Sequence, residues 1–98
     1  MRVMLRARLD TQASNEALKS GALPDTMQEL MEQLKPEAAY FGPCDGGRSC
    51  TFVFDMQDSS QLPAISESLF REFGAEVEIQ PVMTAEDLRK GLAALHRD

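Results

Sequence analysis

The sequence predicts an α+β domain in which helices cover one face of a four-stranded antiparallel sheet. Segments that alternate apolar and polar residues, as strands do, are interleaved with segments whose apolar residues recur at helical spacing. Size is a second observation, because 98 residues provide enough chain for one hydrophobic core and not for two. With 43% hydrophobic and 27% charged residues, the composition is that of an ordinary globular protein. We therefore expect a single domain over residues 1–98.

The first third of the chain predicts a strand followed by a broken helix. Residues 2–9 alternate as a strand does, with one side formed by Val3, Leu5, Ala7 and Leu9 and the other by Met4, Arg6 and Arg8. Thr11 and Ser14 are candidate caps for the following helix. Gly21 and Pro24 interrupt its pattern, so we expect two pieces. The second piece carries an apolar stripe of Leu23, Met27, Leu30, Met31 and Leu34.

A hairpin is predicted next, because Lys35 precedes a proline and the α conformation is disfavoured at such a residue. Residues 37–41 and 50–56 form the two strands. Asp45-Gly46-Gly47 accepts the positive φ angles that a tight turn needs.

The register of this hairpin remains open in the sequence. A longer loop places Tyr40 opposite Phe54, whereas a two-residue Gly46-Gly47 turn places Phe41 opposite Phe52. Tyr40 is the only tyrosine, and a lone aromatic residue on a strand is more often a packing residue than a catalytic one.

The last part of the chain predicts helix, strand and helix. Asp58 is a candidate N-cap and Gly74 a stop for a helix whose core face is Leu62, Ile65, Leu69, Phe70 and Phe73. Residues 75–82 alternate again, with Glu76, Glu78 and Gln80 pointing outward. Thr84 caps a final helix, in which Asp87 is placed for a capping box. This helix carries Leu88, Leu92 and Leu95.

The predicted order is β-α-β-β-α-β with a C-terminal helix, a ferredoxin-like sandwich whose strands lie in the order 4-1-3-2. Both main helices then cover the same face of the sheet. The third strand is apolar on both sides, which indicates that something also covers its second face. An identical subunit is the usual candidate in a short chain, so we expect a homodimer. In the alternative interpretation, Phe52 and Phe54 belong to the core under the helices and Val53 is a lone exposed valine.

The chain resembles a known superfamily at four stretches: residues 36–41, the Asp-Gly-Gly hairpin at 45–47, residues 52–55 and residues 78–88, the last reading Glu-Ile-Gln-Pro-Val-Met-Thr-Ala-Glu-Asp-Leu. These stretches are similar to the short uncharacterised bacterial proteins of the dimeric α/β-barrel superfamily. The resemblance implies that two sheets pack face to face, with a ligand cavity inside the barrel or between sheet and helices. Members include isomerases, cofactor-independent monooxygenases, haem-degrading enzymes and ligand-binding modules, so the resemblance alone assigns no activity.

The candidate ligand-binding residues lie mainly on the open face of the predicted sheet. Cross-strand ion pairs are the simplest interpretation of arginines on the first strand beside glutamates on the fourth. Alternatively, an arginine inside a closed barrel would hold the carboxylate or enolate of a small substrate, because the guanidinium is a planar fork of donors. The candidates are Arg6, Arg8, Tyr40, Phe52, Phe54, Glu76 and Glu78.

Charge and cysteine content narrow the function classes. The net charge is −6 and the basic residues are scattered, so we expect no nucleic-acid binding. No apolar stretch approaches the length of a membrane span, and no export signal is visible, so we expect no membrane association and a cytoplasmic protein. His96 has no partner at metal-ligand spacing, and no metal is expected. A longer hairpin loop would set Cys44 opposite Cys50, which leaves redox switching as a minor hypothesis.

Three functions remain as hypotheses. The first is a homodimeric small-molecule-binding or accessory domain without its own cofactor. The second is a cofactor-independent isomerase or monooxygenase acting on a small aromatic or polyketide-like acid, with Arg6 or Arg8 as anion clamp and Tyr40 or Glu78 as the proton-transfer group. The third is a purely structural interaction domain. A deep cavity would favour the first two, and a fully packed sheet interface the third.

Overall fold

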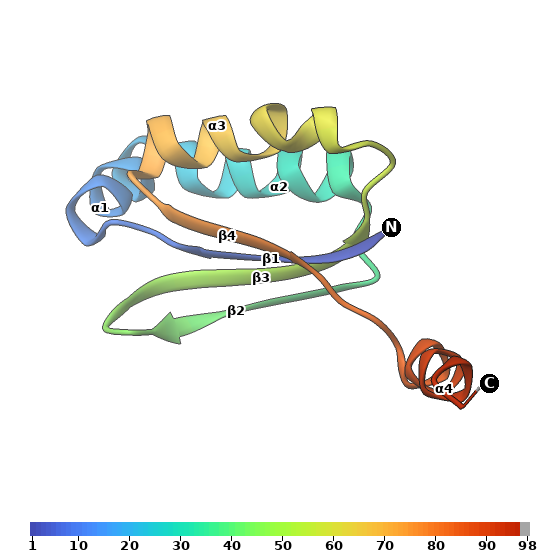
Figure 1. Ribbon diagram of the computed structural model, residues 1–98. Coiled ribbons are helices and arrows are strands. Elements are labelled where there is room, and N and C mark those ends of the chain that lie inside the picture. The colour runs from blue at the N-terminus through green and yellow to red at the C-terminus, as the bar shows by residue number, and fades with distance from the viewer. Residues whose placement is uncertain (97–98) are drawn as a thin grey trace.

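The computed structural model describes residues 1–96 and places three helices on one side of a four-stranded sheet (Figure 1). The strands lie in the order β2-β3-β1-β4 with antiparallel pairings throughout, which confirms the predicted order read from the opposite edge. None of the helices in the described part of the chain has the length and apolar character to cross a membrane. The elements are β1 (Arg2–Arg8), α1 (Thr11–Ser20), α2 (Ala22–Leu34), β2 (Ala38–Cys44), β3 (Gly47–Asp55), the 3-10 helix η1 (Ser59–Gln61), α3 (Leu62–Phe73), β4 (Glu76–Pro81) and α4 (Ala85–Ala94).

The strand register decides which residues face the helices. Leu5 of β1 lies directly between Phe52 of β3 and Ile79 of β4, and residues directly opposite one another share a face of the sheet. Phe52 is 0% exposed and Phe54 is also buried, so both phenylalanines belong to the core under the helices. Of the two interpretations of this strand, the one that places Phe52 and Phe54 in the core under the helices is confirmed, and Val53 lies on the open face together with Thr51.

The break between α1 and α2 confirms the prediction of a helix in two pieces. Gly21 ends α1 with a φ of 87°, a left-handed conformation that glycine adopts without steric cost. The predicted caps were wrong, because the Asp10 carboxylate accepts from the Ala13 backbone N–H at the start of α1. Ser14 lies one turn later, and its buried hydroxyl donates to the Thr11 carbonyl.

The hairpin has a third register, which neither of the predicted turns would produce. Asp45 and Gly46 form a two-residue turn with φ angles of 52° and 77°, so Cys44 pairs with Gly47. Positive φ at both central residues gives the turn a twist that matches the flanking strands. As a result, Tyr40 lies opposite Thr51, and both registers weighed from the sequence are wrong.

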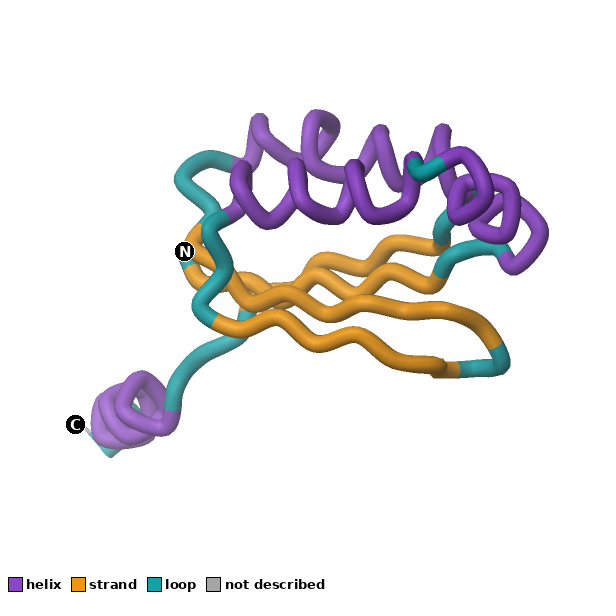
Figure 2. Tube along the Cα trace, turned by 180° about the vertical axis from the view of Figure 1, so that it is seen from behind, coloured by secondary structure: helices purple, strands orange, loops and turns teal. Residues whose placement is uncertain are grey.

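The C-terminal half has the predicted helix caps, but its last helix lies at an unexpected place relative to the sheet. Asp58 and Gln61 form a capping box at η1, and Gly74 ends α3 with a φ of 53°. Thr84 and Asp87 form the predicted capping box of α4. Figure 1 and Figure 2 show α4 standing clear of the sheet, on the side opposite α1, α2 and α3. None of its residues is buried.

Candidate functional site

Four of the predicted site residues meet in a polar hollow on the open face of the sheet. Arg6 lies directly opposite Glu78, and Arg8 directly opposite Glu76, as the predicted antiparallel pairing of β1 and β4 requires. The hollow has a volume of about 270 Å³ and lies near the β2–β3 turn. The residues that line it are Arg6, Ala7, Arg8, Cys44, Asp45, Ser49, Cys50, Thr51, Glu76 and Glu78.

The two arginines of the hollow have different partners. The Arg8 Nε donates to the Asp45 carbonyl at 3.0 Å, and its guanidinium lies 3.3 Å from where a Cβ would stand on Gly47, so Arg8 supports the turn. Among residues 1–96, Arg6 makes no side-chain hydrogen bond, and no ion pair within 4.0 Å joins either arginine to a glutamate of β4. The Arg6 guanidinium is thus available to a ligand.

The three aromatic candidates are separated by the sheet. Tyr40 is 69% exposed and lies on the open face, in line across the strands with Thr51 and Arg6. Phe52 and Phe54 lie on the opposite face under the helices and cannot reach the hollow. The four charged candidates and the tyrosine therefore share one surface: Arg6, Arg8, Glu76, Glu78 and Tyr40.

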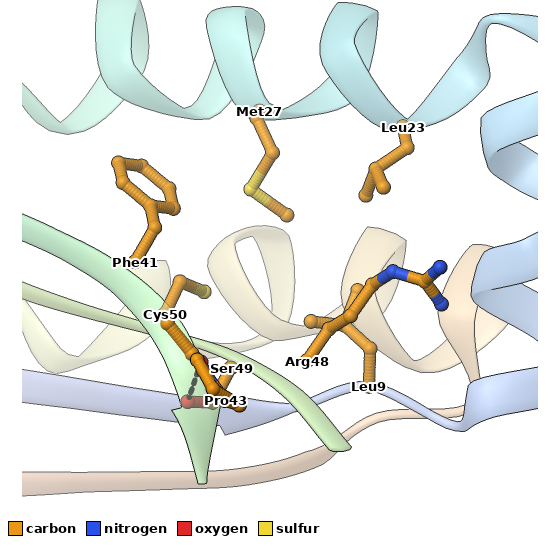
Figure 3. Close-up of a pocket in the computed structure, with 9 residues that line it drawn as sticks. Leu9, Leu23, Met27, Phe41, Pro43, Arg48, Ser49 and Cys50 are labelled. Atoms are coloured by element: carbon orange, nitrogen blue, oxygen red, sulfur yellow. Dashed lines mark hydrogen bonds between the residues drawn. The ribbon is translucent and has the colours of Figure 1, made fainter.

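A second cavity, which the sequence analysis missed, lies between α2 and the β2–β3 edge of the sheet (Figure 3). Its volume is about 340 Å³. Phe41 lies on the helix-facing side of β2 but is 58% exposed, because the helices do not extend fully over this edge strand. Its ring meets that of Phe52 edge to face, with the ring centres 5.7 Å apart. The apolar cleft, as we call this cavity, is lined by Leu9, Leu23, Met27, Phe41, Gly42, Pro43, Arg48, Ser49 and Cys50.

The polar groups around the apolar cleft already have partners within the protein. Arg48 donates from Nη1 to the Ser14 hydroxyl at 2.7 Å and to the Asn15 side-chain oxygen at 2.9 Å, which directs its guanidinium toward α1. The Ser49 hydroxyl donates to the Gly42 carbonyl at 2.7 Å, as the dashed line in Figure 3 marks.

Burial raises the pKa of the Cys50 thiol to about 11, so this group is uncharged at neutral pH. The cleft therefore offers carbon and sulfur surface rather than a free charge.

The helix α4 presents a third surface. Leu88, Leu92 and Leu95 follow one another at helical spacing and are all exposed, with half of the Leu92 side chain accessible. Among residues 1–96 there is no group of three or more His, Cys, Asp or Glu side chains that would hold a metal ion.

Comparison with protein families assigns the chain to a family. Residues 1–96 match the family described as a domain of unknown function, DUF3303. The chain belongs to this family. A search of curated proteins gives no match. Among solved structures, the fold is similar to the de novo designed protein Ferredog-Diesel, with a TM-score of 0.50 and 13% sequence identity over 83% of this chain and 85% of that one. At this identity the similarity concerns the ferredoxin-like fold alone.

Proposed function

We propose that this DUF3303 chain is a homodimeric small-molecule-binding domain without its own cofactor, and that its ligand is an uncharged apolar molecule held in the apolar cleft. The observation that carries the proposal is the cleft itself, in which apolar side chains converge and the polar groups are already paired. Ligand pockets are concave and mostly apolar, with few polar groups to orient the ligand.

The size of the apolar cleft narrows the ligand class. A closed apolar cavity of roughly 150 Å³ accommodates one benzene ring, and this cleft measures about 340 Å³. It lies near the lower end of the range of roughly 300–1,000 Å³ that is typical of ligand pockets. A two-ring aromatic molecule or a branched aliphatic chain fits this volume, whereas an organic acid would bring a carboxylate to a cleft without a free cation.

The dimeric part of the proposal is supported by the open face of the sheet. Ala38, Val53 and Met4 lie directly across from one another there, and all three are only partly buried. A second copy packed on this face would remove this row of three side chains from water, in the arrangement of the dimeric α/β-barrel superfamily. The apolar cleft lies on the other side of the sheet and would stay accessible in such a dimer.

The uncharged fluorescent probe N-phenyl-1-naphthylamine tests the cleft. Met27 projects from α2 into the cleft (Figure 3), and Met27→Trp would fill part of the ligand volume. We expect the variant to bind the probe at least about tenfold more weakly than the parent, a loss of about 1.4 kcal/mol. Gln28→Trp is the matched control, because it adds the same ring at the neighbouring exposed position.

Two results would overturn the ligand proposal. One is the absence of saturable probe binding to the parent at micromolar protein. The other is an equal affinity for Met27→Trp and Gln28→Trp, which would place the probe elsewhere on the molecule. Circular dichroism of both variants confirms that the comparison is between folded proteins.

The polar hollow favours a second candidate function, a cofactor-independent isomerase or monooxygenase acting on a small aromatic or polyketide-like acid. The free guanidinium of Arg6 supports it, because a carboxylate or enolate would complete that side chain's hydrogen bonds. Glu78 is directly opposite Arg6 and is the better placed proton-transfer group, since Tyr40 lies two strands away. Benzoate as a test ligand, with Arg6→Ala as the variant, separates this candidate from the first, as described below.

A further inference from the structure

The helix α4 is a complete, capped helix that stands clear of the sheet and the other helices of residues 1–96. The Thr84 hydroxyl accepts from the Asp87 backbone N–H, and the Asp87 carboxylate accepts from the Thr84 backbone N–H, each at 3.2 Å. None of its ten residues is buried. Isolated helices shorter than roughly 12–15 residues are marginal in water, and most helical stability in proteins comes from packing an apolar face. The exposed leucine stripe, defined as Leu88, Leu92 and Leu95, therefore requires a surface to pack on.

The position of α4 directs this stripe away from its own core. Figure 1 and Figure 2 agree that α1, α2 and α3 lie on one side of the sheet and α4 on the other, beyond the end of β4. The connection is fixed where it leaves the sheet, because the Val82 N–H donates to the Arg2 carbonyl at 3.1 Å. The Asp87 carboxylate also lies 3.7 Å from Arg2 Nη1. The helix thus lies on the side of the open face but is displaced from its own sheet.

The open face offers an apolar surface at the same end of the sheet. Met4 is paired with Val53 on one side and with Gln80, near the end of β4, on the other. Ala38 continues this row and Tyr40 follows in the next one. Each chain therefore has two unpartnered apolar surfaces on one side, the leucine stripe and this row.

A second copy of the chain is the partner that matches both surfaces. In a two-fold dimer both subunits use the same patch. The leucine stripe of each chain can therefore pack on the apolar row of the other chain. The four strands contain 7, 7, 9 and 6 residues, of which only about every second one lies on the open face. This is fewer than the roughly 20–30 residues a side that a stable interface takes, and the ten residues of α4 make up the difference. A membrane surface fits less well, because Glu86 and Asp87 stand beside Arg89 and Lys90 and the chain carries a net charge of −6.

We infer that α4 is exchanged between subunits, with the leucine stripe of each chain packed across the open sheet face of the other. The inference rests on the proposed dimer and adds to it that the C-terminal helix, rather than sheet-to-sheet contact alone, holds the two subunits together. It is independent of the apolar cleft, which lies on the opposite side of the sheet.

Sedimentation of three full-length proteins tests the exchange. Leu92→Glu places a carboxylate within the stripe, whereas Ala93→Glu adds the same charge on the opposite side of α4. We expect the parent and Ala93→Glu to be dimers at micromolar concentration and Leu92→Glu to have a dimer dissociation constant at least about tenfold higher. Circular dichroism should show that the core of all three proteins is folded, since Leu92 is half exposed and lies outside the hydrophobic core of residues 1–96.

A crosslinking measurement identifies the surface that the stripe contacts. Chains with Val53→Cys are mixed with chains with Leu92→Cys, both in a Cys44→Ser background, and treated with a short bis-maleimide. A crosslink between position 53 of one chain and position 92 of the other is expected. A double variant that crosslinks only within one chain would show that α4 folds back onto its own sheet, and it would overturn the exchange.

The outcomes separate this inference from the proposed function. Equal dissociation constants for Leu92→Glu and Ala93→Glu would overturn the helix exchange and leave the dimer intact. A monomeric parent would overturn the dimer as well. Neither result changes the binding of N-phenyl-1-naphthylamine, so the ligand proposal fails or stands on its own titration.

Discussion

The two faces of the sheet differ although the same strands build both. On the helix-covered face, Leu5 and Phe52 are fully buried among the side chains of α1, α2 and α3. On the open face, Met4 and Val53 occupy the equivalent positions one residue along and are only partly buried. The neighbouring residues Phe52 and Val53 do not by themselves distinguish the two faces of β3, because both are apolar. The charges of its neighbours do, since Arg6 and Glu78 fall on the side of Val53.

The largest effect is expected from a charge on the covered face. Phe52→Asp removes a ring that is buried at the centre of the core and places a carboxylate there without a partner. Loss of the ring alone costs roughly 3–5 kcal/mol, and domains of this kind are stable by only about 5–15 kcal/mol. We expect an unfolded protein by circular dichroism at 25 °C. A cooperatively folded Phe52→Asp variant would contradict the face assignment of β3.

The same substitution one residue along the strand should leave the fold intact. Val53→Asp lies on the open face, where the carboxylate reaches water once the subunits separate. The variant should keep the circular dichroism spectrum of the parent and sediment as a monomer, and Val53→Ala is the uncharged control. A Val53→Asp protein that remains a dimer would exclude this face from the interface.

The two cysteines extend the comparison to chemical reactivity. Cys50 faces the covered side and Cys44 the open side, so the two thiols lie on opposite faces of the sheet and cannot form a disulfide without rearrangement. With a pKa of about 11, roughly one Cys50 thiol in a thousand is ionised at pH 8. Iodoacetamide should therefore modify Cys44 and leave Cys50 unmodified in the folded protein, as peptide mass spectrometry would show.

Two controls belong to the thiol prediction. In denaturant both cysteines should react, and the melting temperature should be the same under reducing and oxidising conditions.

Because the pKa of Cys50 is raised above its ordinary value of 9.0 on folding, the folded state holds this proton more tightly. Its contribution to stability is complete below pH 9 and is lost as the pH rises toward 11.

The smallest effect on stability is expected from Arg6→Ala on the open face. The side chain is exposed and has no hydrogen-bond partner among residues 1–96, so the free energy of unfolding should change by less than about 0.5 kcal/mol. If the enzyme candidate is right, benzoate will raise the melting temperature of the parent and of Arg71→Ala, an exposed arginine of α3, but not that of Arg6→Ala. Identical benzoate responses in all three proteins would remove Arg6 from the binding residues.

The elements were predictable where local chemistry decides them. Alternation in residues 2–9, the break at Gly21 and the capping box at Thr84 each depend on a few neighbouring residues, and all three are confirmed. The hairpin register was not, because Asp45-Gly46 and Gly46-Gly47 are both suitable two-residue turns, and moving the turn by one residue changes the partner of Phe41 from Cys50 to Phe52.

The candidate site was predictable only in part, for a related reason. Pairing of β1 with β4 follows from the topology, and it brought Arg6 and Glu78 together as expected. The apolar cleft depends instead on how far α2 is displaced from the edge strand. A displacement of a rigid helix relative to a sheet has no signature in the sequence of either element. The only sign of the cleft in the sequence is Phe41, a large apolar residue on the edge strand that lines the cleft.

The outer strands of the sheet bear on how copies of this protein avoid uncontrolled polymerisation. β2 and β4 form the two edges, and each contains a proline, Pro43 and Pro81. Proline has no N–H to donate to an added strand and occurs mainly at such edges. Each proline therefore removes one hydrogen bond from any strand added at that edge, which disfavours side-by-side extension of the sheet into a fibril. In the proposed dimer, association through the open faces would close after two copies, so a concentrated solution should contain no thread-like aggregates.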